Sequence, residues 1–421
     1  MSLKNNWKIY LILLVTFSIV IFIRFYNFSN RINFGPEQAI SLITTGEYIK
    51  DKITLIGLPS TQRVTSTGHI IFSSPIFNYA LIPLELIFNF DPILITGYFA
   101  LLNIITGLII YLLTKKIFSV QVALFAVILF LFNGYMIYHS LFIWIVNYLP
   151  LLGLLTIYLL FLFRQKNRKI FSLALGLISG IAFGTEYLYL FTAVFVLLFL
   201  IYYSKNKFKD FIIFMLGFAV GNLPLILFDL KHNFYYFGTL YQYLIDTINS
   251  PGQSKLSYYH FLQFWPLLTI IGGVILYKIF RINKYIALLL IALYIFMNLT
   301  SPLVSFNEAV GMNKGLNYNL LNKAAQIIAD NKPEKFNVAT TWDFDSQAHP
   351  LRYLLRFRYE MIPLGIEEYR NADNIYVMTN PTYDINNASL YEISSFRPFK
   401  TELLTNLSND YSVFKLNHLN K

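Results

Sequence analysis

Nine apolar runs of near membrane-spanning length limit the fold of this chain more than any other feature. A bilayer core is crossed by about 20 predominantly apolar residues in a helix. Only 13% of the residues are charged, whereas soluble domains carry about 25%. The sequence therefore predicts a mainly α-helical, polytopic membrane protein with about nine transmembrane helices. The runs lie at 7–23, 92–113, 118–137, 141–163, 170–185, 187–203, 210–228, 261–280 and 284–300.

The net charge of +11 is unevenly placed along the chain. If the N-terminus is cytoplasmic, the segments on that side carry 14 of the 33 Lys and Arg residues, but only Asp210 of the 22 acidic residues. An excess of Lys and Arg in short cytoplasmic loops is the positive-inside pattern of membrane proteins. The charge therefore indicates a multi-pass protein of the plasma (cytoplasmic) membrane with its N-terminus inside, and it argues against binding of nucleic acid.

Most of the chain outside the apolar runs falls on the extracytoplasmic side. It comprises a first loop at 24–91, a second segment at 229–260 and everything after 300. We expect a transmembrane domain at 1–300 and a small extracytoplasmic α/β domain at 301–421. In the latter, the patterns predict helices at 316–330 and 346–357, and strands at 336–341, 374–379 and 411–416.

The first loop is predicted to contain two helices. Pro36 suits the first helical position and Glu37 the first turn. Apolar residues such as Ala39 and Ile43 recur on one face of this helix, which is typical of a helix lying on a membrane surface. The apolar segment 75–90 is too short to span a bilayer, so it is interpreted as an interfacial or re-entrant helix.

Glu37 is the strongest candidate for a catalytic group. A helix dipole favours the anionic form of a carboxylate in the first turn. Close to the membrane face, this carboxylate could accept a proton from a hydroxyl or amide that attacks an activated sugar. The alternative is an ordinary solvated carboxylate at a helix start, and the local sequence alone favours that alternative.

A polar segment at the end of the seventh run is a second candidate. Asp229, Lys231 and His232 follow one another where the chain leaves the membrane, and ionisable residues at that depth tend to be functional. Lys231 and His232 could neutralise a lipid-linked phosphate as it becomes the leaving group. The alternative is an interfacial cap with a Lys side chain that reaches toward water.

Other polar residues at the ends of apolar runs have two interpretations each. Glu186 is either part of a tight turn or an intramembrane acid that faces the site. Trp144 and Asn147 open the fourth run, where Trp is usually an interface anchor. Asp343 and Asp345 follow a predicted strand and could bind a divalent ion, although such residues are also common in loops. We assign no metal ligand from the sequence.

Four short motifs lie within residues 24–237. They are Arg24-Phe25-Tyr26 with Phe34–Ala39, Ser73–Tyr79, Trp144–Pro150, and Leu223–Phe234. Together they resemble the GT-C superfamily of polyprenyl-phosphate-sugar-dependent glycosyltransferases, and most closely the bacterial relatives of the protein O-mannosyltransferases and of the lipid A aminoarabinose transferase. Ser73 and Leu141 depart from the family's His and Arg, and Glu186 stands where relatives often have His.

The resemblance implies transfer of a sugar, with inversion, from a polyprenyl-phosphate donor to a protein, lipid or glycan acceptor at the outer face of the membrane. It implies no nucleotide at the site and leaves the need for a divalent metal open. The alternative is a non-catalytic scaffold, a transporter for lipid-linked sugars or an inactive relative. The resemblance makes Glu37 the catalytic carboxylate, and the substrate-binding candidates are Arg24, Gln38, His69, Trp144, Asn147, Glu186, Asp229, Lys231 and His232.

Overall fold

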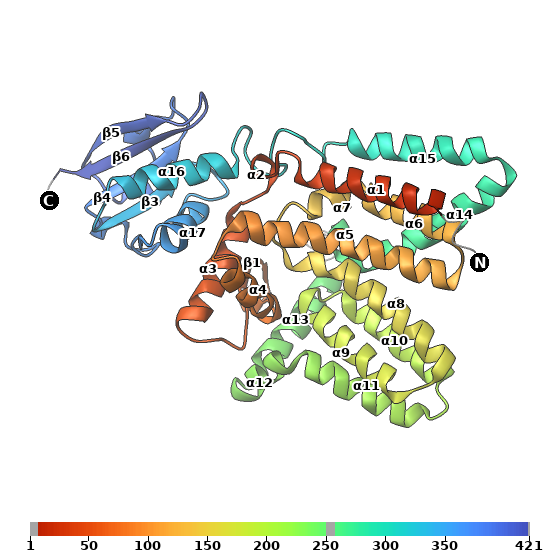
Figure 1. Ribbon diagram of the computed structural model, residues 1–421. Coiled ribbons are helices and arrows are strands. Elements are labelled where there is room, and N and C mark those ends of the chain that lie inside the picture. The colour runs from red at the N-terminus through yellow and green to blue at the C-terminus, as the bar shows by residue number, and fades with distance from the viewer. Residues whose placement is uncertain (1–6, 250–256, 420–421) are drawn as a thin grey trace.

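The structure, a computed structural model, describes residues 7–249 and 257–419. A large helical part occupies one side of the molecule, and a sheet with its covering helices lies at the other end, beside the first loop (Figure 1). The chain begins in the helical part and ends in the sheet. The mainly α-helical architecture is confirmed, and long apolar helices indicate a multi-pass membrane protein.

Four helical segments in the described part of the chain are long and apolar enough to cross a membrane. They are α1 (Trp7–Phe25), α5 (Pro92–Ile117), the segment Ile145–Lys166 formed by η2 (Ile145–Tyr148) and α8 (Leu149–Lys166), and the segment Tyr258–Ile282 formed by η3 (Tyr258–Phe264) and α14 (Trp265–Ile282). Shorter apolar helices are α6 (Val120–Leu131), α9 (Lys169–Thr185), α10 (Tyr189–Tyr203) and α15 (Lys284–Leu299).

Two predicted spans are not single straight helices. The run at 118–137 contains two helices. Helix α6 ends at Leu131, and α7 (Gly134–His139) begins after Asn133, whose side chain caps the first turn of α7. The run at 210–228 divides into α11 (Lys207–Gly221) and α12 (Leu223–Lys231), which meet at an angle of 76°. Pro224 opens α12, where a missing backbone N–H costs nothing. The total of nine spans therefore stays a prediction.

Helices α9 and α11 pack so closely that only glycine fits between them. Each carries two glycines four residues apart, Gly176 and Gly180 on α9, and Gly217 and Gly221 on α11. A Cβ atom added at Gly221 would lie 2.6 Å from the carbonyl oxygen of Leu177, and one added at each of the other three would overlap a backbone oxygen of the facing helix. Paired small residues at this spacing are the usual means by which membrane helices approach one another.

The first loop folds against the C-terminal region rather than lying free. It contains α2 (Phe28–Arg31), α3 (Pro36–Lys50), the hairpin strands β1 (Pro59–Val64) and β2 (Ile70–Phe72), and α4 (Ile76–Ile87). Helix α3 begins at Pro36 as predicted, and Gln38 closes its first turn by accepting a hydrogen bond from the Gly35 amide at 3.1 Å.

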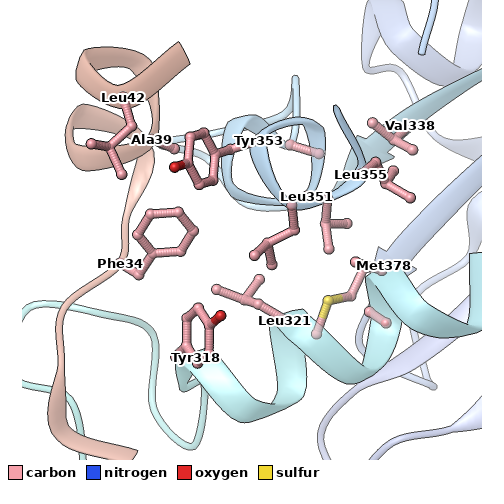
Figure 2. Packing of buried hydrophobic residues seen from close by; sticks show 14 of the residues in the cluster. Phe34, Ala39, Leu42, Tyr318, Leu321, Val338, Leu351, Tyr353, Leu355 and Met378 are labelled. Atoms are coloured by element: carbon pink, nitrogen blue, oxygen red, sulfur yellow. The ribbon is translucent and has the colours of Figure 1, made fainter. Parts of the chain in front are cut away.

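The apolar face of α3 is covered by protein, which corrects the expected membrane-surface placement. Ala39 is fully buried, and Ile43 packs against the same hydrophobic cluster. Phe34 lies between Tyr318 and Tyr353 of the C-terminal region, with ring centroids 5.8 and 5.7 Å away (Figure 2). The first loop and the C-terminal region thus share one core, and the proposed domain boundary at residue 301 stays a prediction.

The C-terminal region is an α/β layer whose predicted elements are present. Strands β3 (Phe336–Thr340) and β4 (Asn374–Thr379) are parallel, and β6 (Ser412–His418) and β5 (Phe399–Asn406) continue the sheet antiparallel in the order β3-β4-β6-β5. Strand β5 was not predicted, because its half-exposed, partly charged sequence lacks a continuous apolar face. Helices α16 (Tyr318–Asp330) and α17 (His349–Arg358) pack on each other; shorter elements are η4 (Tyr369–Asn371), η5 (Ile385–Asn387) and α18 (Tyr391–Ser394).

A carboxyl group without a partner is buried in α4. Glu85 is fully buried, and within the described residues neither carboxylate oxygen has a hydrogen-bond partner. Burial disfavours the charged form and raises the pKa of Glu85 to about 9. Because the folded state holds this proton, Glu85 contributes less to stability as pH rises from the ordinary carboxyl pKa toward 9.

We therefore expect Glu85→Gln to stabilise the protein at pH 8 and to change little at pH 5. The gain is at most about 3 kcal/mol near pH 7, the free energy of holding the proton there. Thermal unfolding in detergent between pH 5 and 9 measures the effect, and Glu334→Gln, at an exposed loop position, is the matched control. A Glu85→Gln variant that is less stable at high pH would show instead that the carboxylate is ionised and paired.

Candidate active site

Glu37 stands in the first turn of α3, at the junction of the first loop with the helical part. The peptide before it is held in place because the Asn33 amide donates to the carbonyl of Leu141 at 3.0 Å, and the Asn33 side chain donates to the carbonyl of Val310. The Glu37 side chain is accessible, and among the described residues its carboxylate makes no hydrogen bond or ion pair. Contacts with two distant segments thus fix the backbone just before Glu37, while the Glu37 carboxylate itself has no hydrogen-bond or ion-pair partner among the described residues.

The electrostatics of Glu37 differ from the sequence-based expectation. The helix dipole was expected to favour the anion, but desolvation by the surrounding protein is the larger effect and raises the pKa of the Glu37 carboxyl. Glu37 interacts electrostatically with Tyr138 of α7, because the hydroxyl pKa of Tyr138 is raised first by burial and then by the charge of Glu37. A carboxylate with a raised pKa is a stronger base than a fully solvated one, which suits proton abstraction.

Behind Tyr138, three residues form a fixed aromatic and polar group. His139 is 3% exposed, and its ring stacks on Trp144 with a centroid distance of 5.7 Å and an interplanar angle of 3°. Its Nδ1 lies 3.0 Å from Asn147 Oδ1, while Asn147 Nδ2 donates to the carbonyl of Phe142 at 2.7 Å. Trp144 and Asn147, both predicted site residues, are therefore held together by His139.

The contact with Asn147 fixes the tautomer of His139, and its burial fixes the charge state. Asn147 must turn its oxygen toward the ring, because its amide nitrogen is used by Phe142. Burial lowers the pKa of His139 to about 4, so the imidazole is neutral at pH 7 and carries its hydrogen on Nδ1. Its Nε2 is then a buried acceptor, and it has no partner among the described residues.

Glu186 is joined to the same group through η3. It directly follows α9 at the predicted turn and is 5% exposed, and its role as an acid that faces the site stays a prediction. Its Oε2 lies 3.0 Å from Nδ1 of His260. The neighbouring Tyr259 ring contacts Trp144 at a centroid distance of 4.8 Å. Glu186, His260, Tyr259 and Trp144 thus form a continuous series of contacts leading toward Tyr138.

A cavity of about 500 Å³ lies beside α12 and is lined by Lys231 and His232, two of the predicted residues at the end of the seventh run. Lys231 and His232 supply its polar side, and His232 is oriented by its Nδ1 contact of 2.8 Å with the carbonyl of Phe228. The remaining lining residues are Ile56, Phe72, Phe228, Asn233 and Tyr235. An apolar cavity with two basic groups at one side can hold an anionic head group together with the start of an apolar chain.

Tyr187 connects the series of contacts around Glu186 and Trp144 with the cavity that Lys231 lines. Its hydroxyl donates to the carbonyl of Phe72 at 2.6 Å, and Phe72 lines the Lys231 cavity. The preceding residue, Glu186, belongs to the His260 and Trp144 series. His69 lies at the edge of the cavity, where its ring contacts Tyr235 at a centroid distance of 5.4 Å.

Three predicted substrate-binding residues make hydrogen bonds within the protein that hold helices or helix ends in place. Arg24 is fully buried and donates to Asn103 at 2.7 Å and to the carbonyl of Leu131, joining α1 to α5 and α6. Gln38 caps α3. Asp229 accepts hydrogen bonds from the amides of Tyr236 at 2.6 Å and Phe237 at 2.9 Å, and so caps α13 (Tyr235–Asn249). In this structure all three position other residues, and their binding roles stay predictions.

Sequence analysis did not identify Tyr138, His139 and His260. A signal was present, because a Tyr-His pair lies in the gap between two apolar runs and His260 lies at the start of another. Asp345, considered as a metal ligand, instead accepts the backbone amide of His349 at 3.0 Å at the start of α17. Among the described residues, no three His, Asp or Glu side chains are grouped as metal ligands, so no residue is assigned to a divalent ion.

The chain is similar to known proteins in part of its sequence and in its fold. The family model described as dolichyl-phosphate-mannose-protein mannosyltransferase matches residues 73–228. The fold is similar to that of ArnT from Cupriavidus metallidurans bound to undecaprenyl phosphate, with a TM-score of 0.61, 12% identity and 98% coverage of both chains. The chain has a GT-C fold. The predicted resemblance to the GT-C glycosyltransferases is thereby confirmed.

Two further solved structures share the GT-C fold. ArnT from the same organism in the apo state matches with a TM-score of 0.53, 11% identity and 98% coverage of both chains. An oligosaccharyltransferase from Archaeoglobus fulgidus, in complex with Zn and sulfate, matches with a TM-score of 0.50 and 10% identity, covering 89% of this chain and 68% of that one. By sequence, no curated protein matches the chain. At these identities the similarity establishes the fold, and the activity has to be argued from the site.

Proposed function

We propose that this protein transfers a sugar from a polyprenyl-phosphate donor to a protein, lipid or glycan acceptor at the outer face of the membrane. The observation that carries the proposal is the free carboxylate of Glu37, held at the start of a fixed helix beside Tyr138, with a pKa raised by desolvation. This combination is that of a general base. ArnT, whose fold is similar, has been crystallised with undecaprenyl phosphate, which supports a lipid-phosphate donor.

The proposed reaction is a single displacement at the anomeric carbon. Glu37 takes the proton from the acceptor hydroxyl or amide while the acceptor atom bonds to the anomeric carbon. The bond from this carbon to the phosphate oxygen breaks, and the phosphate leaves on its lipid. Lys231 and His232 stabilise the charge that develops on the leaving phosphate, and the apolar side of their cavity holds the first isoprenoid units. Attack opposite the leaving group inverts the configuration.

The proposal is tested by transfer of labelled sugar in membranes that contain the protein, using a panel of polyprenyl-phosphate sugars. Transfer above that of membranes without the protein is expected with at least one donor. If no donor supports transfer, the protein is a scaffold, a transporter or an inactive relative. With an active donor, the products of separate assays with membrane protein, lipid and glycan fractions identify the acceptor class.

Loss of the Lys231 charge is expected to weaken donor binding. Lys231→Gln should raise the KM for the donor about tenfold, the value of one hydrogen bond to a charged group. It should also lower kcat, because the charge on the leaving phosphate grows in the transition state. Lys207→Gln is the matched control, because Lys207 is exposed at the start of α11 and lies outside the cavity. Equal KM values for the two variants would place the phosphate elsewhere.

A further inference from the structure

The C-terminal region contains a second cavity, of about 420 Å³, at one end of its sheet. Thr341 directly follows β3 and Asn380 directly follows β4, and both line the cavity. The two strands are parallel, and the hydroxyls of Thr341 and Thr379 lie 2.6 Å apart at their ends. In open α/β sheets, ligands bind in the crevice outside the carboxyl ends of parallel strands. The cavity therefore has the position of a binding site.

The side chains around this cavity suit a neutral, hydroxyl-rich ligand. Trp342, Tyr383 and Tyr411 contribute aromatic surface, and Asp410 and Asn313 contribute acceptors and donors for hydrogen bonds. Lys314 balances the charge of Asp410, so the cavity has no net charge to attract an ionic group. Aromatic surface for C–H faces together with amide and carboxylate groups for hydroxyls is the chemistry that binds a saccharide.

The cavity wall is held in place before any ligand binds. Trp342 is 7% exposed, stacks on Phe344 with a centroid distance of 6.0 Å, and meets the Tyr411 ring edge-on at 6.2 Å. The hydroxyl of Tyr411 donates to the carbonyl of Lys314 at 2.9 Å, which fastens the segment after α15 to the sheet. A preformed wall lowers the ordering cost of binding.

The same segment connects this cavity to the Glu37 site. Gly311 lies against the candidate site, because a Cβ atom added there would be 3.0 Å from the Tyr138 hydroxyl and 2.7 Å from Asn33 Nδ2. Asn313, which lines the cavity, follows only two residues later. Two residues of extended chain span at most about 7 Å. The edge of the cavity and the residue that lies against Tyr138 and Asn33 therefore belong to one short stretch of backbone.

We propose that this cavity at the carboxyl ends of β3 and β4 binds a neutral saccharide, and that this saccharide is part of the acceptor. The assignment to the acceptor rests on the proposed glycosyltransferase function, whereas the binding of saccharide does not. A peptide acceptor that pairs with a strand would use the partly exposed edge strand β5, because β3 is buried and its outer edge is hydrogen-bonded to Ser346 and Leu364. It would not use the ends of β3 and β4. The geometry favours a saccharide for this reason.

The test is direct binding of fluorescently labelled neutral oligosaccharides to the full chain in lipid nanodiscs. The probes are di- to tetrasaccharides of glucose, mannose, galactose and N-acetylglucosamine. At least one is expected to bind saturably, and Asp410→Asn and Tyr383→Ala should each weaken its binding about tenfold or more. Asp343→Asn, an exposed acid close to the cavity but outside its lining, is the matched control and should bind as wild type.

Three results would overturn the proposal. They are the absence of saturable binding by every probe, equal binding by Asp410→Asn and Asp343→Asn, and capture of a peptide in place of saccharides. These results are separable from failure of the proposed function. Sugar transfer that requires Glu37 but is unaffected by Asp410→Asn would retain the function and reject the cavity as the acceptor site. Cavity-dependent saccharide binding without transfer from any donor would retain the site and reject its acceptor role.

Discussion

Glu37→Gln is expected to reduce the rate of sugar transfer by roughly 10²–10⁴-fold, the usual contribution of a positioned general base. The substitution preserves the size and shape of the side chain and removes its basicity. The carboxylate makes no hydrogen bond or ion pair within the described residues, so folding should be unaffected. The reduction should fall on kcat with little change in the donor KM, because the proton transfer occurs only in the transition state.

The pH dependence of transfer provides a second measure of the same group. The base must be ionised to act, so the rate falls as pH decreases through the pKa of Glu37. Because desolvation raises that pKa, the acidic limb of the pH–rate profile should lie above the range of an ordinary Glu carboxyl, and it should be absent from any residual activity of Glu37→Gln. An acidic limb at the ordinary Glu pKa would show a fully solvated carboxylate.

Glu47→Gln is the matched control for this experiment. Glu47 lies on the same helix, ten residues after Glu37, and its side chain is 45% exposed and pairs with Arg356 at 2.8 Å. Removing a partly exposed ion pair costs roughly 0–1 kcal/mol, so Glu47→Gln should retain near wild-type transfer. Equal transfer by wild type and Glu37→Gln would reject Glu37 as the base and direct attention to the residues around Lys231.

The features that sequence analysis predicted correctly depend on local signals. The start of α3 follows from Pro36 and Glu37, and strand β4 has the predicted bounds because its apolar residues form a continuous buried run. The apolar runs are helical for a related reason, since a chain in lipid must satisfy its backbone hydrogen bonds internally. The resemblance to the GT-C glycosyltransferases also came from short motifs that lie within single segments.

The features that it did not predict depend on contacts between distant segments. Asp229 stays a predicted substrate-binding residue, but its capping of α13 was not predicted, because only the turn of the chain after α12 brings it to the amides of Tyr236 and Phe237. His260 approaches Glu186 only because η3 packs beside the end of α9. The face of Ala39 was assigned to the membrane because periodicity identifies a buried face without identifying what buries it.

The close contact of α9 with α11 leads to the largest expected effect on stability. Gly176→Val and Gly217→Val each place a branched side chain where even a Cβ atom overlaps the carbonyl oxygen of Phe214 or Leu173. Backbone cannot move aside as a flexible side chain can, so the helices must separate and lose their packing. Each substitution should cost about 1–3 kcal/mol or more, measured by unfolding with sodium dodecyl sulfate in mixed micelles.

The losses of unfolding free energy caused by Gly176→Val and Gly217→Val should not be additive. Once either valine has separated the helices, the second meets less resistance, so the double variant should lose less free energy than the two single losses combined. Gly238→Ala is the matched control, because a Cβ atom at this position of α13 meets no atom within 4 Å, and alanine there should be neutral or stabilising. Additive losses at Gly176 and Gly217 would mean that the two glycines relieve separate contacts instead of one shared helix spacing.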